Sequence, residues 1–311
     1  MSFTAEVKDE LSRVDGPHAA CALAELSALM RICGTLSYRG PGRYSIRIAT
    51  ETGSVARTAL RLIHQNLDLQ TQLTVRRSVQ RKNRNYLIEI PEQEGLADVL
   101  TRLGILIEGK GLASGVPKSL TSEGDTIRSF VLGAFMAGGF VADPRRDFHM
   151  EIAVTGERFA DDIVDLVKRM GVTSRLNHRR GSYAIYIKSY EDVRFLLEAL
   201  GAERSAQVVE GVRKLKSVKN NVNRRVNAEL ANDRRSSRSG AEQLHVIGRV
   251  AHEVGLKNLP PALREFCELR VRHPEMSLAD LGKMCDPPAS KSAMYHRVLR
   301  LQQIGKEDAS S

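Results

Sequence analysis

The sequence predicts an α+β fold in which a pseudo-two-fold duplicated domain is followed by a basic linker and an all-α C-terminal domain. The order helix, hairpin, helix, hairpin, helix occurs twice, in about residues 20–104 and 126–201. Positive charge is concentrated directly after the second repeat, and the last part of the chain has helical periodicity. We therefore expect three parts, residues 1–204, 205–240 and 241–311.

Each repeat begins with an apolar helix that carries small residues. The first helix includes LSALMRICG, ending at Gly34, and the second includes VLGAFMAGG, ending at Gly139. A turn and a strand follow in both repeats, and the strands end at Thr50 and Thr155, each 16 residues after its glycine. This matched spacing indicates a duplicated unit.

The small residues predict a close contact between the two first helices. Ala24 and Ala28 are spaced i, i+4 on one helix, as are Gly133 and Ala137 on the other. A helical glycine costs about 1 kcal/mol relative to alanine, and small side chains let backbones approach closely. The alternative is an ordinary core helix with incidental glycines.

An amphipathic helix and an alternating hairpin follow in each repeat, beginning with SVARTALRLIHQNL and ERFADDIVDLVKRM. Both hairpins are basic. These positions could hold DNA, contact a protein or an anionic ligand, or be solvated tips; they are Arg76, Arg77, Arg81, Lys82 and Arg84 in the first hairpin, and Arg175, His178, Arg179, Arg180 and Lys188 in the second.

Composition favours an intracellular protein with a polyanionic partner. The 311 residues carry a net charge of +10 with a pI of about 9.6. The 12-residue apolar run from Val131 to Ala142 is too short for a membrane span, which needs about 20 residues. The N-terminus lacks the apolar region of a signal peptide, and the four cysteines form no CxxC pair. We expect a cytoplasmic protein that is not associated with a membrane and that needs no metal or cofactor; if it resembles DNA-binding proteins, it would be nucleoid-associated.

The linker is the most basic segment. Ten basic and three acidic residues lie between Arg204 and Arg238. We expect its first part to be helical and its end, up to RRSSRSG, to be looser. Arg234 and Arg235 are candidate phosphate contacts, although charge runs are usually solvated faces.

The sequence of the C-terminal domain predicts a helix-turn-helix. SLADLGKMC begins with Ser277 as N-cap, DPPAS is a break, and SKSAMYHRVLRLQQIG is a longer helix. Met294 and Val298 should pack against Leu278 and Leu281. The second helix would enter the major groove of DNA by its N-terminal end. The candidate DNA contacts are Ser290 (equally a helix cap), Lys291, Ser292, Tyr295, His296, Arg297 and Arg300.

The two motifs, within their matching repeats, resemble the paired motifs of LAGLIDADG homing endonucleases, whose two sheets form a saddle over DNA. In the active enzymes an acidic residue before the last glycine of each motif holds a catalytic divalent metal. Here Cys33 and Gly138 occupy those positions. A thiol is too soft a ligand for Mg²⁺, and glycine offers none. Asp143, in ADP, is typical of a turn carboxylate rather than a substitute ligand. The resemblance therefore implies a degenerate LAGLIDADG-like domain that is not an enzyme.

The whole chain resembles the WhiA family of bacterial regulators, most clearly in VLGAFMAGGFVADP and LPPALREFCELRVRHPEMSLADLGKMCDPPASKSAMYHR. The resemblance implies a sequence-specific regulator that binds double-stranded DNA. It also implies roles in cell division, chromosome segregation and, in some bacteria, sporulation, and a WhiB-type iron–sulfur regulator as partner. Two alternatives stay open: a protein-interaction scaffold whose LAGLIDADG-like domain binds a partner, and an active nuclease.

Overall fold

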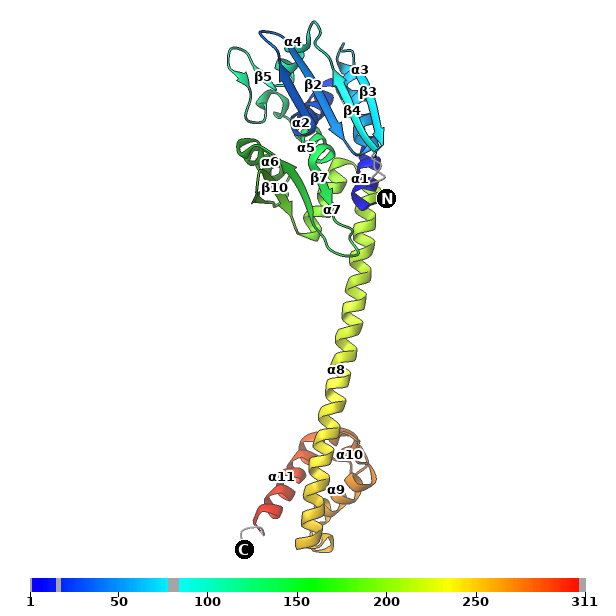
Figure 1. Ribbon diagram of the computed structural model, residues 1–311. Helices are drawn as coiled ribbons and strands as arrows, with labels where there is room; N and C mark the ends of the chain where they lie inside the picture. The colour runs from blue at the N-terminus through cyan, green and yellow to red at the C-terminus, as the bar shows by residue number, and fades with distance from the viewer. Residues whose placement is uncertain (1, 15–17, 78–83, 308–311) are drawn as a thin grey trace. The chain divides into compact units, whose positions relative to one another are not determined.

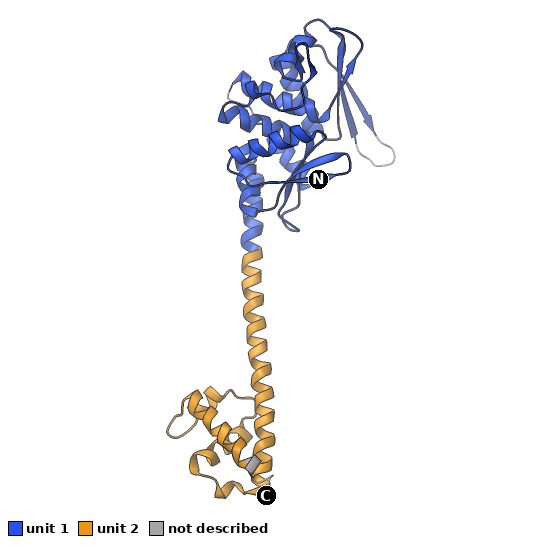
Figure 2. Cartoon of the chain, turned by 90° about the vertical axis from the view of Figure 1, so that its left-hand side faces the viewer, with its two compact units in different colours: residues 1–215 blue, residues 216–311 orange. Residues whose placement is uncertain are grey.

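The computed structural model describes residues 2–14, 18–77 and 84–307 (Figure 1). The chain divides into two compact units, residues 1–215 and 216–311 (Figure 2). The described part of the chain contains no helix long and apolar enough to cross a membrane.

The first repeat lies in the first unit, after a short N-terminal helix, α1 (Phe3–Leu11). Its four strands form an antiparallel sheet in the order β1-β2-β4-β3. The elements are α2 (Ala19–Cys33), β1 (Gly34–Tyr38), β2 (Tyr44–Thr50), α3 (Gly53–Asn66), β3 (Gln72–Arg77), β4 (Arg84–Ile90) and α4 (Leu96–Arg102).

The second repeat has the same element order and the equivalent antiparallel sheet, β7-β8-β10-β9. The predicted duplication is therefore confirmed. The elements are α5 (Gly124–Gly138), β7 (Gly139–Val141), β8 (Met150–Val154), α6 (Glu157–Arg169), β9 (Arg175–Arg179), β10 (Ser182–Ile187) and α7 (Tyr190–Leu200). Between the repeats lie β5 (Leu106–Ile107), β6 (Gly111–Leu112) and the short 3₁₀ helix η1 (Lys118–Leu120).

Alternation along the strands sends one face of each sheet into the core. Ile48 pairs with Ile88 across β2 and β4, and both are fully buried. Their neighbours Arg47 and Glu89 pair on the opposite, solvent-exposed face. We call this exposed face of each sheet its saddle face, because the resemblance to the homing endonucleases leads us to expect a DNA saddle there.

The two first helices, α2 and α5, pack directly against each other at the centre of the unit. A Cβ at Gly133 would lie 2.1 Å from the backbone carbonyl oxygen of Glu25, so only glycine fits this approach. Ala24 and Ala28 are fully buried on α2, and Ala137 is partly buried on α5. The close backbone approach accounts for the low-propensity residues in these helices.

The linker differs from the expectation. It is part of α8, one continuous helix from Glu203 to Glu253 that also contains the first predicted helix of the C-terminal domain. The expectation that the end of the linker, up to RRSSRSG, is looser is therefore wrong. The boundary between the two compact units falls within this helix, after Leu215.

The remaining helices pack on the end of α8. They are η2 (Leu256–Asn258), α9 (Pro261–Arg272), α10 (Leu278–Lys283) and α11 (Lys291–Glu307). Val250 of α8 shares a core with Phe266 and Met294, and all three are fully buried.

Arg270 is also buried in this domain. Its guanidinium group donates to Gln243 Oε1 of α8 at 2.9 Å and to the carbonyl oxygen of Met276 at 2.6 Å. This side chain therefore ties α8 to the turn before α10.

Candidate nucleic-acid interface

The α10–turn–α11 segment is built by two serine caps and one glycine. Ser277 Oγ accepts from the Asp280 backbone N–H at 3.2 Å, and Ser290 Oγ accepts from the Ala293 N–H at the same distance. Ser290 therefore caps α11, and its contact with DNA stays a prediction. A Cβ at Gly282 would lie 2.2 Å from the Ala289 carbonyl oxygen, so glycine allows the turn to fold back on α10.

One side of α11 is buried against the other helices. Met294 is fully buried and Val298 nearly so, in a core that includes Leu281, with Leu278 partly buried against it. The spacing of Met294, Val298 and Leu301 fixes which side of α11 faces inward.

The opposite side of α11 is exposed and carries most of the candidate DNA contacts. Tyr295 is 53% exposed and has an edge contact with the His296 ring at 6.4 Å. Arg300 donates to Gln303 Oε1 at 3.3 Å. The exposed candidates are Lys291, Ser292, Tyr295, His296 and Arg300. They offer hydrogen-bond donors and a flat ring on one surface.

Arg297, also predicted as a DNA contact, differs from this set. Its guanidinium Nη1 lies 3.0 Å from Glu265 Oε2 of α9, and its side chain is only 18% exposed. It also contacts Cys285 Sγ at 3.3 Å. Arg297 lies beside the buried Val298, within reach of a carboxylate on another helix, and therefore points along the protein rather than outward.

Glu265 positions α11, and no pattern in the sequence predicts this role. Its carboxylate accepts from the Asp286 N–H at 2.8 Å in the turn before α11. This backbone hydrogen bond, and then Arg297, lower the pKa of Glu265 below its ordinary value. Its sequence position on α9 carried no motif; only its contacts reveal that it anchors α11.

The basic side chains of the linker lie on α8. Arg234 and Arg235 are both exposed. At 3.6 residues per turn, Arg224 and Arg235 fall on the side of the helix opposite the exposed Val222 and Val226. The helix therefore presents a basic side that is separate from its apolar side.

The saddle faces of the first unit carry paired charges. Arg47 Nε donates to Glu89 Oε1 at 3.0 Å, and both Nη atoms of Arg179 donate to the Glu151 carboxylate, at 3.1 and 2.6 Å. The first hairpin exposes Arg76, Arg77 and Arg84, and the second exposes Arg175, His178 and Arg180. Arg81 and Lys82 lie outside the described residues. Carboxylates thus neutralise part of the positive charge expected there.

The motif ends show why metal chemistry is disfavoured. Cys33 Sγ donates to the Leu29 carbonyl oxygen at 3.1 Å, and burial raises the pKa of this thiol to about 12. A Cβ at Gly138 would lie 2.3 Å from the carbonyl oxygen of Ala153. The first position thus holds a neutral thiol, and the second has no room for a side chain unless β8 shifts.

Other candidate ligands do not gather near these ends. Asp143 Oδ1 accepts from the Arg145 N–H at 2.9 Å, as a turn carboxylate does. His149 stacks on Tyr186 with ring centroids 5.4 Å apart. Within residues 2–14, 18–77 and 84–307, no three His, Cys, Asp or Glu side chains are grouped to hold a metal ion.

Three family descriptions match consecutive parts of the chain. They are the WhiA N-terminal LAGLIDADG-like domain at residues 19–106, the WhiA LAGLIDADG-like domain at 127–219 and the WhiA C-terminal HTH domain at 222–305. The chain belongs to the WhiA family. The resemblance seen in the sequence is thereby confirmed, as is the duplicated LAGLIDADG-like fold followed by a helix-turn-helix domain.

Relatives in the WhiA family match over nearly their whole length. A probable cell division protein WhiA from Clostridium novyi is 34% identical over 99% of this chain and 98% of its own. The probable cell division protein WhiA from Heliobacterium modesticaldum is 37% identical over 98% of this chain and 96% of its own. The crystal structure of full-length WhiA from Thermotoga maritima has a TM-score of 0.62 at 25% identity, covering 99% of both chains.

Proposed function

We propose that this WhiA family member is a sequence-specific regulator that binds duplex DNA and has no nuclease activity. The observation that carries the proposal is the sidedness of α11. Met294 and Val298 are buried, while Lys291, Tyr295 and His296 are exposed beyond a capped N-terminus. This is the arrangement by which a recognition helix presents its first turns to base edges.

The basic side of α8 supports a second, sequence-independent contribution. Its arginines offer positive charge without a fixed contact geometry, and phosphate contacts supply affinity but carry no base information. DNA binding therefore divides between α11, which reads bases, and α8, which attracts the backbone. From the family membership we also propose a role in cell division, with chromosome segregation, sporulation, a WhiB-type partner and nucleoid localisation as further predictions.

The test is footprinting of the full-length protein on genomic fragments, followed by titration of one protected duplex and one scrambled duplex. We expect protected sites and a preference for the protected duplex. Combined Lys291→Ala and His296→Ala should reduce that preference. Arg272→Ala, on the exposed side of α9, removes a positive charge in the same domain and should leave the preference unchanged. Equal binding of both duplexes by the unaltered protein would contradict sequence-specific recognition.

The scaffold alternative has its own test. If the first unit binds a protein partner rather than DNA, removing the charge on the saddle faces, for example by Arg76→Ala with Arg175→Ala, should leave affinity for DNA unchanged. A large loss of DNA affinity would instead place the saddle in the DNA interface.

A further inference from the structure

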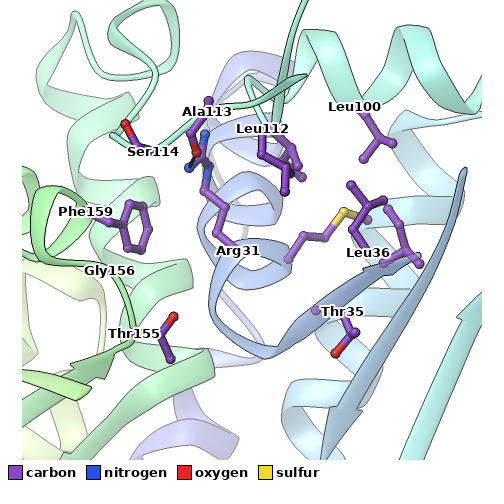
Figure 3. Close-up of a pocket in the computed structure, with 14 residues that line it drawn as sticks. Arg31, Thr35, Leu36, Leu100, Leu112, Ala113, Ser114, Thr155, Gly156 and Phe159 are labelled. Atoms are coloured by element: carbon purple, nitrogen blue, oxygen red, sulfur yellow. Dashed lines mark hydrogen bonds between the residues drawn. The ribbon is translucent and has the colours of Figure 1, made fainter. Parts of the chain in front are cut away.

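The first unit contains a cavity of about 440 Å³ between its two repeats (Figure 3). The walls are mostly apolar and include Met30, Leu36, Leu100 and Phe159, with Arg31 projecting from α2 between them. This volume and this mixture of apolar walls with few polar groups are typical of small-molecule sites. Nothing in the proposed DNA-binding role uses it.

The pseudo-two-fold repeat shows what the equivalent place holds in the other half. Gly34 begins β1 and Gly139 begins β7, so Met30 corresponds to Phe135 and Leu36 to Val141. These counterparts are the residues that α1 contacts. Thr4 Oγ1 donates to the Val141 carbonyl oxygen at 2.8 Å. The groove that holds α1 in one half is therefore equivalent, by the pseudo-two-fold repeat, to the cavity in the other half.

In the half with α1, the chain itself fills the groove. Val7 and Leu11 of α1 are buried, with 0% and 1% of their surface exposed. The Lys8 ammonium lies 5.9 Å from the centroid of the Phe135 ring. The groove thus takes an apolar body that carries one charged group.

In the other half, the segment between the repeats covers only part of the groove. Val116 N–H donates to Asp162 Oδ2 at 2.8 Å, which fixes this segment to α6. Ile105, Leu112 and Ala113 form one wall, and the cavity is the space that they leave.

Arg31 gives the cavity its charge. Its guanidinium group donates to the carbonyl oxygens of Gly104 and Ala113 and lies 5.5 Å from the centroid of the Phe159 ring. Within the described residues no carboxylate lies within ion-pair distance of it. Burial lowers the pKa of Arg31 to about 10, and the charge of Asp162, which also contacts Val116 and Arg158, offsets only part of this shift. A partly buried cation in an apolar wall, whose nearest carboxylate is shared with Val116 and Arg158, favours an additional anionic partner.

We propose that this cavity binds a small monocarboxylic acid with an apolar body, whose carboxylate pairs with Arg31 and whose body lies against Met30, Leu36 and Phe159. The hydroxyl group of Ser114 lies on the same side of the cavity as the Arg31 guanidinium group (Figure 3) and can donate to the acid. A strongly hydrated anion such as phosphate does not suit walls that are largely apolar.

The test uses 4-phenylbutyrate as probe, with 4-phenylbutanamide as its uncharged counterpart and inorganic phosphate as a second anion. Binding to the full-length protein is measured by isothermal titration calorimetry at pH 7. We expect the acid to bind at least tenfold more tightly than the amide, and phosphate not to bind. Equal binding of acid and amide would overturn the role of the charge, and so would phosphate binding that competes with the acid.

Three variants locate the site. Arg31→Gln should weaken binding of the acid at least tenfold. Leu112→Trp, which fills the cavity from a side chain that is 67% exposed, should abolish binding. Arg47→Gln, an exposed arginine outside the cavity, should bind as the unaltered protein does. If Arg31→Gln fails to fold, Leu112→Trp decides the question, and unchanged binding by that variant would place the acid elsewhere and overturn the proposal.

Discussion

Arg297 of α11 and Glu265 of α9 form an ion pair, with 3.0 Å between Nη1 and Oε2. The pair also reaches the turn between α10 and α11, because Glu265 accepts from the Asp286 N–H and Arg297 contacts Cys285 Sγ. Three segments of the helix-turn-helix domain therefore meet at one contact. This geometry indicates that Arg297 holds α11 against α9 and the turn.

We predict that Arg297→Ala lowers the free energy of unfolding of this domain by about 1–2 kcal/mol, because it removes a charge-assisted hydrogen bond and leaves Glu265 without its cation. Affinity for the target should fall together with this stability, because the exposed side chains of α11 are then held less firmly. Lys291→Ala, on the exposed side, should leave the unfolding free energy unchanged and weaken binding. Thermal unfolding and titration of both duplexes measure the two effects. A selective loss of target affinity in Arg297→Ala at unchanged stability would show that Arg297 reads a base.

The contact between α2 and α5 gives a second prediction. Gly133→Ala should destabilise the first unit by about 1–3 kcal/mol, since its Cβ would lie 2.1 Å from the Glu25 carbonyl oxygen and the helices must separate. Gly211→Ala on α8 is the matched control. It has no atom within 4 Å of the added Cβ and should be neutral or stabilising, because alanine favours a helix. Equal melting temperatures for the two variants would contradict close packing at Gly133.

The sequence predicts the duplication of the first unit but not the continuity of α8. Gly34 and Gly139, with their matched following strands, repeat along the chain, so the duplication was predictable. The continuity of α8 was not predicted, because asparagine and serine have low helix propensity. Yet Val218, Val222, Val226 and Leu230 recur at i+4 through that stretch, and this signal favoured a helix.

Contacts between elements were harder to predict than the elements themselves. The inward turn of Arg297 depends on Glu265, which lies on a different helix and 32 residues away in sequence. The serine at position 290 was equally suited to a cap or to a DNA contact; the hydrogen bond from Ala293 shows the cap, and the DNA contact stays a prediction. The cavity beside Arg31 could not be predicted from a local pattern. It is the space that remains because α1 fills the equivalent groove in only one of the two halves.

A third prediction concerns nuclease activity. We expect no Mg²⁺-dependent nicking of supercoiled plasmid by the purified protein, because the motif ends offer a thiol and a glycine in place of carboxylates. Cys33→Asp combined with Gly138→Asp should not create activity, since the new side chain at position 138 would collide with the Ala153 carbonyl oxygen. Nicking by the unaltered protein that disappears in Asp143→Ala would show that Asp143 serves as a ligand instead.

Glu25 supports a prediction of pH dependence. Its side chain is 2% exposed, its Oε1 has no hydrogen-bond partner in the described part of the chain, and burial raises its pKa to about 8. Between its ordinary pKa, near 4.5, and about 8, the folded state holds a proton that the unfolded state has released. Stability from this group is therefore greatest below pH 4.5 and is lost as the pH rises to about 8.

Glu25→Gln removes this ionisation while keeping the size of the side chain. Its unfolding free energy relative to the unaltered protein should rise between pH 5 and 8, by at most about 1.4 kcal/mol per pH unit. Urea unfolding at several pH values measures the difference. Glu6→Gln, at an exposed carboxyl group on α1, is the control for the loss of a carboxyl charge. A constant difference for Glu25→Gln across this range would show that Glu25 ionises normally in the folded protein.

The last prediction separates the basic side of α8 from α11. Arg234→Ala with Arg235→Ala removes two exposed charges from a helix that offers no fixed contact geometry to bases. Affinity for target and random DNA should therefore fall about equally. The slope of log affinity against log salt should flatten by roughly two units, since each phosphate contact contributes about −0.9 through counterion release.

The matched control for this pair removes the same net charge from the first unit. Arg13→Ala with Arg57→Ala takes away two exposed arginines that both pair with Asp9, and should leave the salt slope unchanged. If both double variants flattened the slope equally, the effect would reflect net charge and not contact by α8. If the α8 variant instead lost target affinity alone, Arg234 and Arg235 would hold a defined position on the site. The long helix would then share in sequence recognition, because only a contact with fixed geometry discriminates one duplex from another.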